Sequence, residues 1–179
     1  MFYTISDDLV LYQILKFIKK YTNSELKLYK YFHNKTGGIY PEFIAIIGQF
    51  IFFFVQNEYY FDSKTYLDSM RREIRGKKIL IIRAEKVLIN FLFSLFPDLY
   101  IHNISLEKND SSGKKEISIY FLTYKERGIA VGSGADYIRS VNKLFIHHVI
   151  FENNSKPIEI RCKNLTPKST NFIKLKTIA

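Results

Sequence analysis

The chain's most telling segment is Arg127-Gly-Ile-Ala-Val-Gly-Ser-Gly-Ala-Asp-Tyr-Ile-Arg-Ser-Val-Asn-Lys-Leu144, in which a glycine-rich turn leads directly into a helix with regular apolar spacing. Glycines allow the backbone of such a turn to approach a ligand closely and to present its N–H groups. The N-terminus of the following helix adds positive potential, so a phosphate can lie against the bare backbone. The segment therefore predicts a binding site for a phosphate backbone, without a catalyst.

The composition favours a polyanionic partner. The 179 residues carry 27 Lys and Arg against 17 Asp and Glu, which gives a formal net charge of +10 and a pI near 9.5. Residues 1–75 hold 10 basic and 8 acidic side chains, whereas residues 76–179 hold 17 and 9, so the excess lies in the half with the glycine turn. A basic balance of this size points to nucleic acid or an anionic surface. A lysine-rich surface that only serves solubility is the plain alternative.

Several classes of protein are disfavoured by the sequence. The single cysteine, Cys162, excludes an internal disulfide and a cysteine-rich zinc site, and it indicates a reducing compartment. Asp7 and Asp8 precede a first apolar run that lysines interrupt, so neither a signal peptide nor a membrane-spanning helix is predicted, and we expect no membrane partner. His147 and His148 are adjacent and diverge on a helix, so we expect no metal and no cofactor. A phosphate loop and a nucleophile elbow are also missing, which predicts a protein that is not an enzyme.

The residue usage indicates the kind of genome that encodes the protein. The chain is rich in Phe (16) and Tyr (13) and contains no Trp, which is what AT-rich codons produce. This bias indicates an organellar location, the plastid in the first place, with a bacterial-type cytoplasm as the alternative.

The first half of the chain is predicted to be helical and then β-rich. In order, the pattern predicts a helix over 7–21, a short helix over 25–32, a turn over 34–38, two strands over 39–60 that break near Gly48, a short helix or loop insertion over 61–72, and a strand over 78–83. The aromatic residues of this half, Phe52, Phe53, Phe54, Tyr59 and Tyr60, are predicted to be core or stacking platforms for bases.

The second half of the chain is predicted to contain both helices and strands. The pattern predicts a helix over 84–96 that Pro97 stops, strands over 99–107 and 116–124 joined by a hairpin loop over 108–115, the glycine turn, a helix over 135–148, a strand over 157–162 and a short helix over 167–177. No internal repeat is visible in the sequence.

This order of elements resembles the prokaryotic-type K-homology (KH) module, whose GxxG loop clamps about four nucleotides of single-stranded backbone. The family pattern Ile-Gly-x-x-Gly-x-x-Ile falls on Val131–Ile138, with Ala135 in place of the second glycine. A plain turn that joins two elements is the alternative for Gly132 and Gly134.

The resemblance extends to one family. Gly128–Leu144 resembles the first KH domain of the bacterial transcription elongation factor NusA, and Arg75–Arg83 resembles the last strand of that factor's OB-type barrel. Residues 84–99 resemble its connecting helix, and the segments 158–160 and 172–175 resemble its closing strand and exit helix. The resemblance implies an α+β fold in three parts: a helical N-terminal segment over 1–35, a degenerate OB-like β piece over 36–83, and a type II KH domain with a C-terminal tail over 84–179.

The resemblance also implies a function. It predicts an RNA-binding protein that contacts nascent single-stranded RNA at RNA polymerase and modulates pausing, termination or antitermination. The alternative is a KH-type structural protein of an organellar ribosome or another ribonucleoprotein, which binds ribosomal RNA beside ribosomal proteins. The basic residues Lys163, Lys168, Lys174 and Lys176 favour the ribosome, and the weakly charged N-terminal part favours the polymerase.

The predicted RNA-binding residues are the loop and its flanks: Lys125, Arg127, Val131, Gly132, Ser133, Gly134, Ala135, Tyr137, Arg139 and Lys143. The family's loop arginines correspond to Gly134 and Tyr137, so we expect weak binding that needs a second contact surface. Tyr137 is predicted either to stack on a base or to pack against its own protein. Replacement of Gly132 by Asp is expected to abolish RNA binding and to leave the fold intact.

Overall fold

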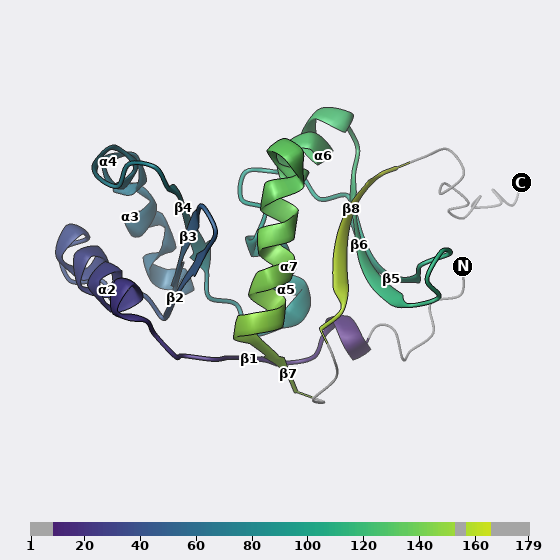
Figure 1. The fold of residues 1–179 in the computed structure, drawn as a ribbon, viewed down its shortest axis with the longest axis horizontal. Helices are drawn as coiled ribbons and strands as arrows, with labels where there is room; N and C mark the ends of the chain where they lie inside the picture. Colours follow the sequence, from purple (N-terminus) through teal and green to yellow (C-terminus); the bar gives the residue numbers. More distant parts are fainter. Residues whose placement is uncertain (1–8, 153–156, 166–179) are drawn as a thin grey trace, which may run out of the picture.

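The computed structural model describes residues 9–152 and 157–165 and shows an α+β protein with three small sheets (Figure 1). The α+β fold class agrees with the sequence prediction. The named helices and strands are β1 (Leu15–Phe17), α2 (Asn23–Lys35), β2 (Phe43–Ile47), β3 (Phe50–Val55), the 3-10 turn η1 (Asn57–Tyr59), α3 (Tyr60–Lys64), α4 (Leu67–Glu73), β4 (Lys78–Arg83), α5 (Leu88–Ser94), β5 (Asn103–Lys108), β6 (Lys115–Phe121), α6 (Tyr124–Val131), the 3-10 turn η2 (Ser133–Ala135), α7 (Asp136–His148), β7 (Val149–Phe151) and β8 (Glu159–Asn164).

The two three-stranded sheets share one topology. The order helix, strand, strand, helix, helix, strand occurs first in α2-β2-β3-α3-α4-β4 and again in α5-β5-β6-α6-α7-β8, where β7, which pairs with β1 in the two-stranded sheet, is inserted between α7 and β8. In each sheet the first strand pairs antiparallel with the second, and the second pairs parallel with the last. We call residues 23–83 the first repeat and residues 88–164 the second repeat. This duplication is not visible in the sequence.

The sheet of the first repeat is buried on both faces. Ile51, Phe53 and Val55 of β3 face the helices of their own repeat, where the Phe32 ring of α2 lies 4.6 Å from that of Phe53. The alternate residues Phe50, Phe52 and Phe54 belong to the core that also contains α5 and α7 of the second repeat (Figure 1). A strand buried on both faces needs a continuous apolar run, which is what residues 50–55 provide.

This arrangement differs from the OB-like piece predicted over 36–83. The expected strands are present, but β2, β3 and β4 form an open sheet with a parallel β3–β4 pair, whereas an OB barrel has five strands. The predicted helix over 25–32 is confirmed as α2, which begins with a capping box between Thr22 and Glu25. Because α2 packs against this sheet, it is part of the first repeat.

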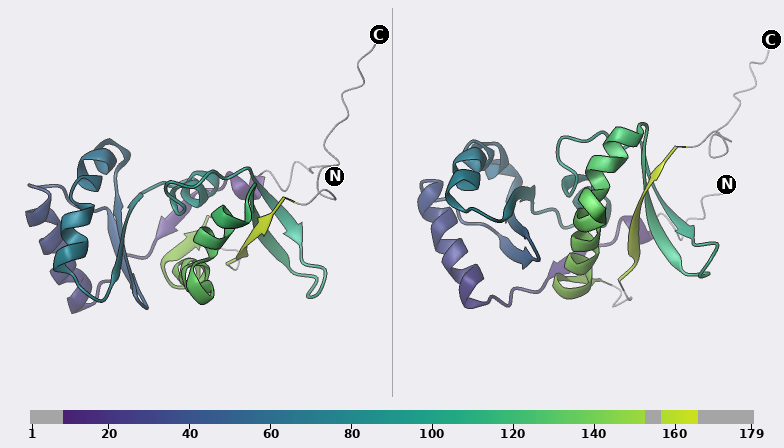
Figure 2. Two further views of the ribbon diagram at one scale, coloured as in Figure 1. Left: turned by 90° about the horizontal axis from the view of Figure 1, so that it is seen from above. Right: turned by 45° about the horizontal axis from the view of Figure 1, so that its top comes forward.

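The predicted helix over 7–21 is wrong over most of its length: among the described residues of this range, only 9–11 are helical. Leu15–Phe17 instead forms β1, which pairs antiparallel with β7. The backbone N–H of Leu15 also donates to the carbonyl of Lys86 at 2.7 Å. Alternation of buried Leu15 with exposed Lys16 suits a strand, so tertiary pairing overrides the approximate helical periodicity. The chain thus runs from beside the second repeat, through β1, to α2 of the first repeat (Figure 2).

Most of the remaining predictions are confirmed with shifted ends. The turn over 34–38, the break at Gly48 and the hairpin loop over 108–115 are present, and residues 61–72 form α3 and α4. The helix before Pro97 begins at Leu88 rather than at residue 84. The helix predicted over 167–177 lies outside the described residues, as do Lys168, Lys174 and Lys176 of the basic tail.

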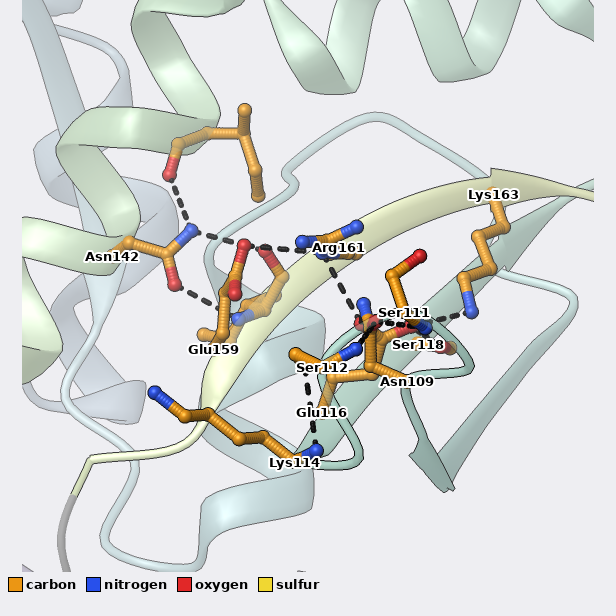
Figure 3. Close-up of polar contacts among 12 residues, drawn as sticks. Asn109, Ser111, Ser112, Lys114, Glu116, Ser118, Asn142, Glu159, Arg161 and Lys163 are labelled. Carbon is orange, nitrogen blue, oxygen red and sulfur yellow. Dashed lines mark hydrogen bonds and ion pairs between the residues drawn. The ribbon is translucent and has the colours of Figure 1, made fainter.

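The outer face of the second sheet carries a connected polar cluster around Glu107 and Glu116, and Figure 3 shows the part around Glu116. Glu107 accepts hydrogen bonds from Ser105 at 2.8 Å, Ser118 at 2.9 Å, Lys163 at 2.8 Å and the Tyr120 hydroxyl. Glu116 pairs with Lys163 at 2.6 Å and with Arg161 at 3.2 Å, and only 4% of its side chain is exposed. Lys163 is therefore a structural cation of β8 rather than a residue of a free tail.

The cluster makes stability depend on pH. Burial alone would raise the pKa of Glu107, but the hydrogen bonds from Lys163, Tyr120 and the two serines outweigh burial and hold the pKa at about 2, below its usual 4.5. A lowered pKa in the folded state means that the carboxylate stabilises the fold above about pH 4.5 and that this contribution is lost as the pH falls towards about 2.

We therefore expect Glu107→Gln to lower the free energy of unfolding by about 2 kcal/mol near neutral pH and by almost nothing below about pH 2. Urea denaturation across this pH range measures the difference. The control is Glu58→Gln on exposed η1, which should leave stability almost unchanged at every pH. A constant difference between wild type and Glu107→Gln over the whole pH range would contradict the role of this carboxylate.

Candidate nucleic-acid interface

The glycine loop lies between two helices, of which the sequence analysis missed the first. Thr123 starts α6 with a capping box: its Oγ1 accepts from the Glu126 N–H at 3.1 Å, and the Glu126 carboxylate accepts from the Thr123 N–H at 3.2 Å. The Thr-x-x-Glu pattern was the available signal. The helix ends at Gly132, whose N–H donates to the Gly128 carbonyl at 3.0 Å and whose φ is 80°.

The predicted turn over Gly132–Ala135 is confirmed, and its backbone is left-handed at three positions. The φ angles are 80° at Gly132, 56° at Gly134 and 62° at Ala135. Only Ala135 carries a Cβ there, and a left-handed conformation costs an L-residue about 1 kcal/mol. Ala135, which stands at the second glycine position of the pattern that the sequence resembles, keeps a glycine-type conformation under strain.

Gly132 has no room for a side chain. A Cβ at this position would lie 2.8 Å from Tyr137 Cβ, 2.9 Å from the Tyr137 backbone nitrogen, and in hard contact with the Asp136 carboxylate. The expectation that Gly132→Asp leaves the fold intact is therefore wrong. Ser133 is exposed and has no such constraint, which makes it the better position for testing the loop.

The loop presents two unused hydrogen-bond donors. Within the described residues, no hydrogen bond uses the backbone N–H of Ser133 or of Gly134. Both residues are exposed, and they lie just before the N-terminus of the 13-residue helix α7. Free N–H groups and the positive end of a helix are the two features that bind a phosphate without a side chain.

The predicted cations lie on the two helices that flank the loop. Lys125 is exposed on α6, and Arg139 and Lys143 are exposed one turn apart on α7. None of these three forms an ion pair with another described residue, so their charge remains available to an anion. Arg127 already uses one of its hydrogen-bond donors, because its Nε donates to the Cys162 carbonyl at the edge of β8 at 3.1 Å.

Two of the predicted residues face the core. Tyr137 is 8% exposed, packs against Phe50, Phe52 and Phe96, and donates its hydroxyl hydrogen to the Leu95 carbonyl. Burial raises its pKa far above the usual value. The alternative that Tyr137 packs is therefore the one observed, and it cannot stack on a base. Val131 is half-buried and packs against the same core.

Asp136 is a charged neighbour of the loop that the sequence analysis did not select. Its Oδ2 lies 3.1 Å from Lys78 Nζ and also accepts from the Gln49 side chain. Both partners come from the first repeat. An unpaired carboxylate beside the loop would repel phosphate, so the lysine of the first repeat offsets a charge that would otherwise oppose anion binding.

The free edge of β8 is closed by side chains of the flanking helices. Asn142 of α7 donates to the Ile160 carbonyl at 3.0 Å and accepts from the Ile160 N–H at 2.8 Å (Figure 3). These bonds fix the spacing between α7 and the sheet. Burial raises the pKa of the nearby Cys162 thiol to about 12, so this cysteine stays protonated and is a poor nucleophile.

Comparison with known proteins supports the arrangement of the two repeats. No family model matches the chain, and no curated protein sequence matches it. Among solved structures, 18 chains match. One is the crystal structure of APE1850. It superposes with a TM-score of 0.56 at 19% sequence identity and covers 80% of this chain and 100% of its own.

The match to APE1850 concerns the fold alone, because the identity is low. Neither repeat by itself makes up four fifths of the chain, so the shared fold spans both repeats. Within the described residues, no helix is long and apolar enough to cross a membrane. The same part of the chain holds no group of three His, Cys, Asp or Glu side chains that could bind a metal ion.

Relief of the strain at Ala135 gives a direct test of the loop geometry. We expect Ala135→Gly to raise the free energy of unfolding by about 0.5 kcal/mol, because the gain from the left-handed φ exceeds the entropy that glycine adds to the unfolded chain. The matched variant Gly134→Ala introduces the same strain in open space and should lower stability by about 1 kcal/mol. Urea denaturation measures both, and destabilisation by Ala135→Gly would contradict the assigned conformation.

Proposed function

We propose that this protein binds single-stranded RNA through the loop Gly132–Ala135, as a KH-like, NusA-like factor that acts without catalysis. The observation that carries the proposal is the pair of unused N–H groups at Ser133 and Gly134, exposed between two helices and followed by a helix N-terminus. The exposed Lys125, Arg139 and Lys143 supply further phosphate contacts.

The element order of the second repeat also supports a type II KH unit. Helix, strand, strand, glycine loop, helix, strand is the order that the family resemblance implies, and α6 adds a helix directly before the loop. We infer that the first repeat is a second KH-like unit rather than an OB-like piece, because it has the same strand pairing. Its corresponding connection between α3 and α4, Thr65-Tyr66, contains no glycine. In this proposal only the second repeat therefore has an RNA clamp, the loop Gly132–Ala135.

The resemblance to NusA makes RNA polymerase the proposed host, where the protein contacts nascent RNA and modulates pausing, termination or antitermination. A ribonucleoprotein such as an organellar ribosome is the other candidate. The basic-tail argument for the ribosome is weakened at Lys163, which is paired with Glu107 and Glu116. Residue usage alone supports a plastid location.

The clamp is tested by Ser133→Glu. A carboxylate at this exposed position faces the approaching phosphate, so we expect single-stranded RNA to bind about tenfold more weakly at low salt. Filter binding with a labelled RNA of about 12 nucleotides measures the affinity. The matched control Ser111→Glu adds the same charge to the exposed β5–β6 hairpin loop and should have little effect. Equal affinities for Ser133→Glu and wild type would rule out the clamp.

The host complex is tested by affinity purification of the full-length protein from its native compartment. Polymerase subunits should co-purify with the wild-type protein and also with Ser133→Glu, because protein contacts hold the factor at the polymerase. Recovery of ribosomal proteins and ribosomal RNA in place of polymerase subunits would overturn the proposed host and favour the ribonucleoprotein.

A further inference from the structure

A cavity of about 260 Å³ lies where the two repeats meet. Its walls come from α3, the last residue of β4, α5 and the segment Phe96–Leu99. The four residues Phe96–Leu99 also line a neighbouring cavity of about 280 Å³ that reaches Gly132 and Asp136 of the loop. The two cavities are therefore adjacent, and an extended chain bound at the loop has a path to the first.

Exposed aromatic rings line this cavity. Phe61 of α3 is 69% exposed, and Phe93 of α5 is 46% exposed. The rings come from different repeats, so only the packing of the repeats brings them to one cavity. Large exposed apolar side chains beside a cavity mark a binding surface, and flat aromatic faces suit a base in particular.

An available guanidinium lies beside these rings. Arg83 lies 4.4 Å from the ring centroid of Tyr60 and 5.2 Å from that of Phe61. Among the described residues no carboxylate forms an ion pair with Arg83. Lys64, the other cation of the cavity, is already paired with Asp98 at 2.9 Å. The cavity therefore combines aromatic faces with one positive charge that no carboxylate of the described residues neutralises, and an occupant with both a ring and an anionic group complements it.

We propose that this cavity binds a second nucleotide of the same single-stranded RNA, with the base against Phe61 and Phe93 and its phosphate at Arg83. The assignment rests on the proposed RNA binding at the loop. A purely apolar protein segment would cover the rings but would leave the Arg83 charge unmatched, so the charge favours a nucleotide. The degenerate loop thus gains the second contact that its weak clamp requires.

Tryptophan fluorescence gives a direct readout, because the chain contains no Trp. The substitution Phe93→Trp places a single fluorophore in the proposed cavity, and a stacked base should quench it. The control Tyr40→Trp replaces a side chain that is 59% exposed between α2 and β2, and the emission of this variant should not change. RNA of about 12 nucleotides should quench the emission of Phe93→Trp, whereas RNA of four nucleotides, which the clamp alone can hold, should not.

Affinities separate this proposal from the proposed function. Phe61→Ala and Arg83→Gln should each weaken binding of the longer RNA about tenfold and leave binding of the four-nucleotide RNA unchanged. Ser133→Glu should weaken both. Circular dichroism verifies that each variant is folded, and Phe93→Trp keeps the aromatic packing and serves as the conservative variant.

Each outcome decides one of the two proposals. Loss of binding in Ser133→Glu, together with unquenched emission of Phe93→Trp and unchanged affinity of Phe61→Ala, overturns the second nucleotide site and leaves the clamp standing. Equal quenching by the four-nucleotide RNA also overturns it, because the cavity would then be part of the clamp. Failure of the wild-type protein to bind either RNA overturns the proposed function and the site that rests on it.

Discussion

The six residues of β3, Phe50–Val55, are buried on both faces of the first sheet, and this burial joins the two repeats. One face packs against α2 and α4, and the other packs against α5 and α7. A sheet exposed on its second face would leave Phe50, Phe52 and Phe54 in water, at a cost of about 2 kcal/mol for each ring. The repeats are therefore parts of one folded body rather than independent modules on a linker.

The same packing fixes the loop. Tyr137 is the second residue of α7, and its ring lies against Phe50 and Phe52 while its hydroxyl bonds the end of α5. Gly132 packs directly on the Tyr137 backbone, so a residue with a Cβ would push the loop away from the core. The glycine of the exposed loop is thus also required by the core, and Lys78 of the first repeat neutralises Asp136 at the same place.

The sequence predicts local elements well here and tertiary arrangement poorly. The strands over 43–55 and the helix α7 follow from periodicity, turn residues and capping. The OB-like piece was expected from the resemblance of Arg75–Arg83 to a barrel strand. The apolar run Phe50–Val55 could not correct this expectation, because a run buried on both faces looks the same whichever elements cover it. The predicted helix over 7–21 failed at β1 because the partner of β1 lies far along the chain in β7, beyond any local pattern. In the candidate site the loop was found, but Tyr137, chosen as a ligand contact, is core.

The duplication was hidden for a physical reason. Repeats are found in sequence when the same positions keep the same residues, yet the two units here face different surroundings. The first sheet is covered on both faces, whereas the outer face of the second carries the Glu107 and Glu116 cluster, so one needs an apolar run and the other an alternating pattern. Their helix–helix connections also diverge, with Thr65-Tyr66 in one and four loop residues in the other. The first repeat, whose helix–helix connection contains no glycine, still provides the surface against which α7 packs. The proposed second contact accordingly falls at the junction, where side chains from both repeats meet, and not at the connection Thr65-Tyr66.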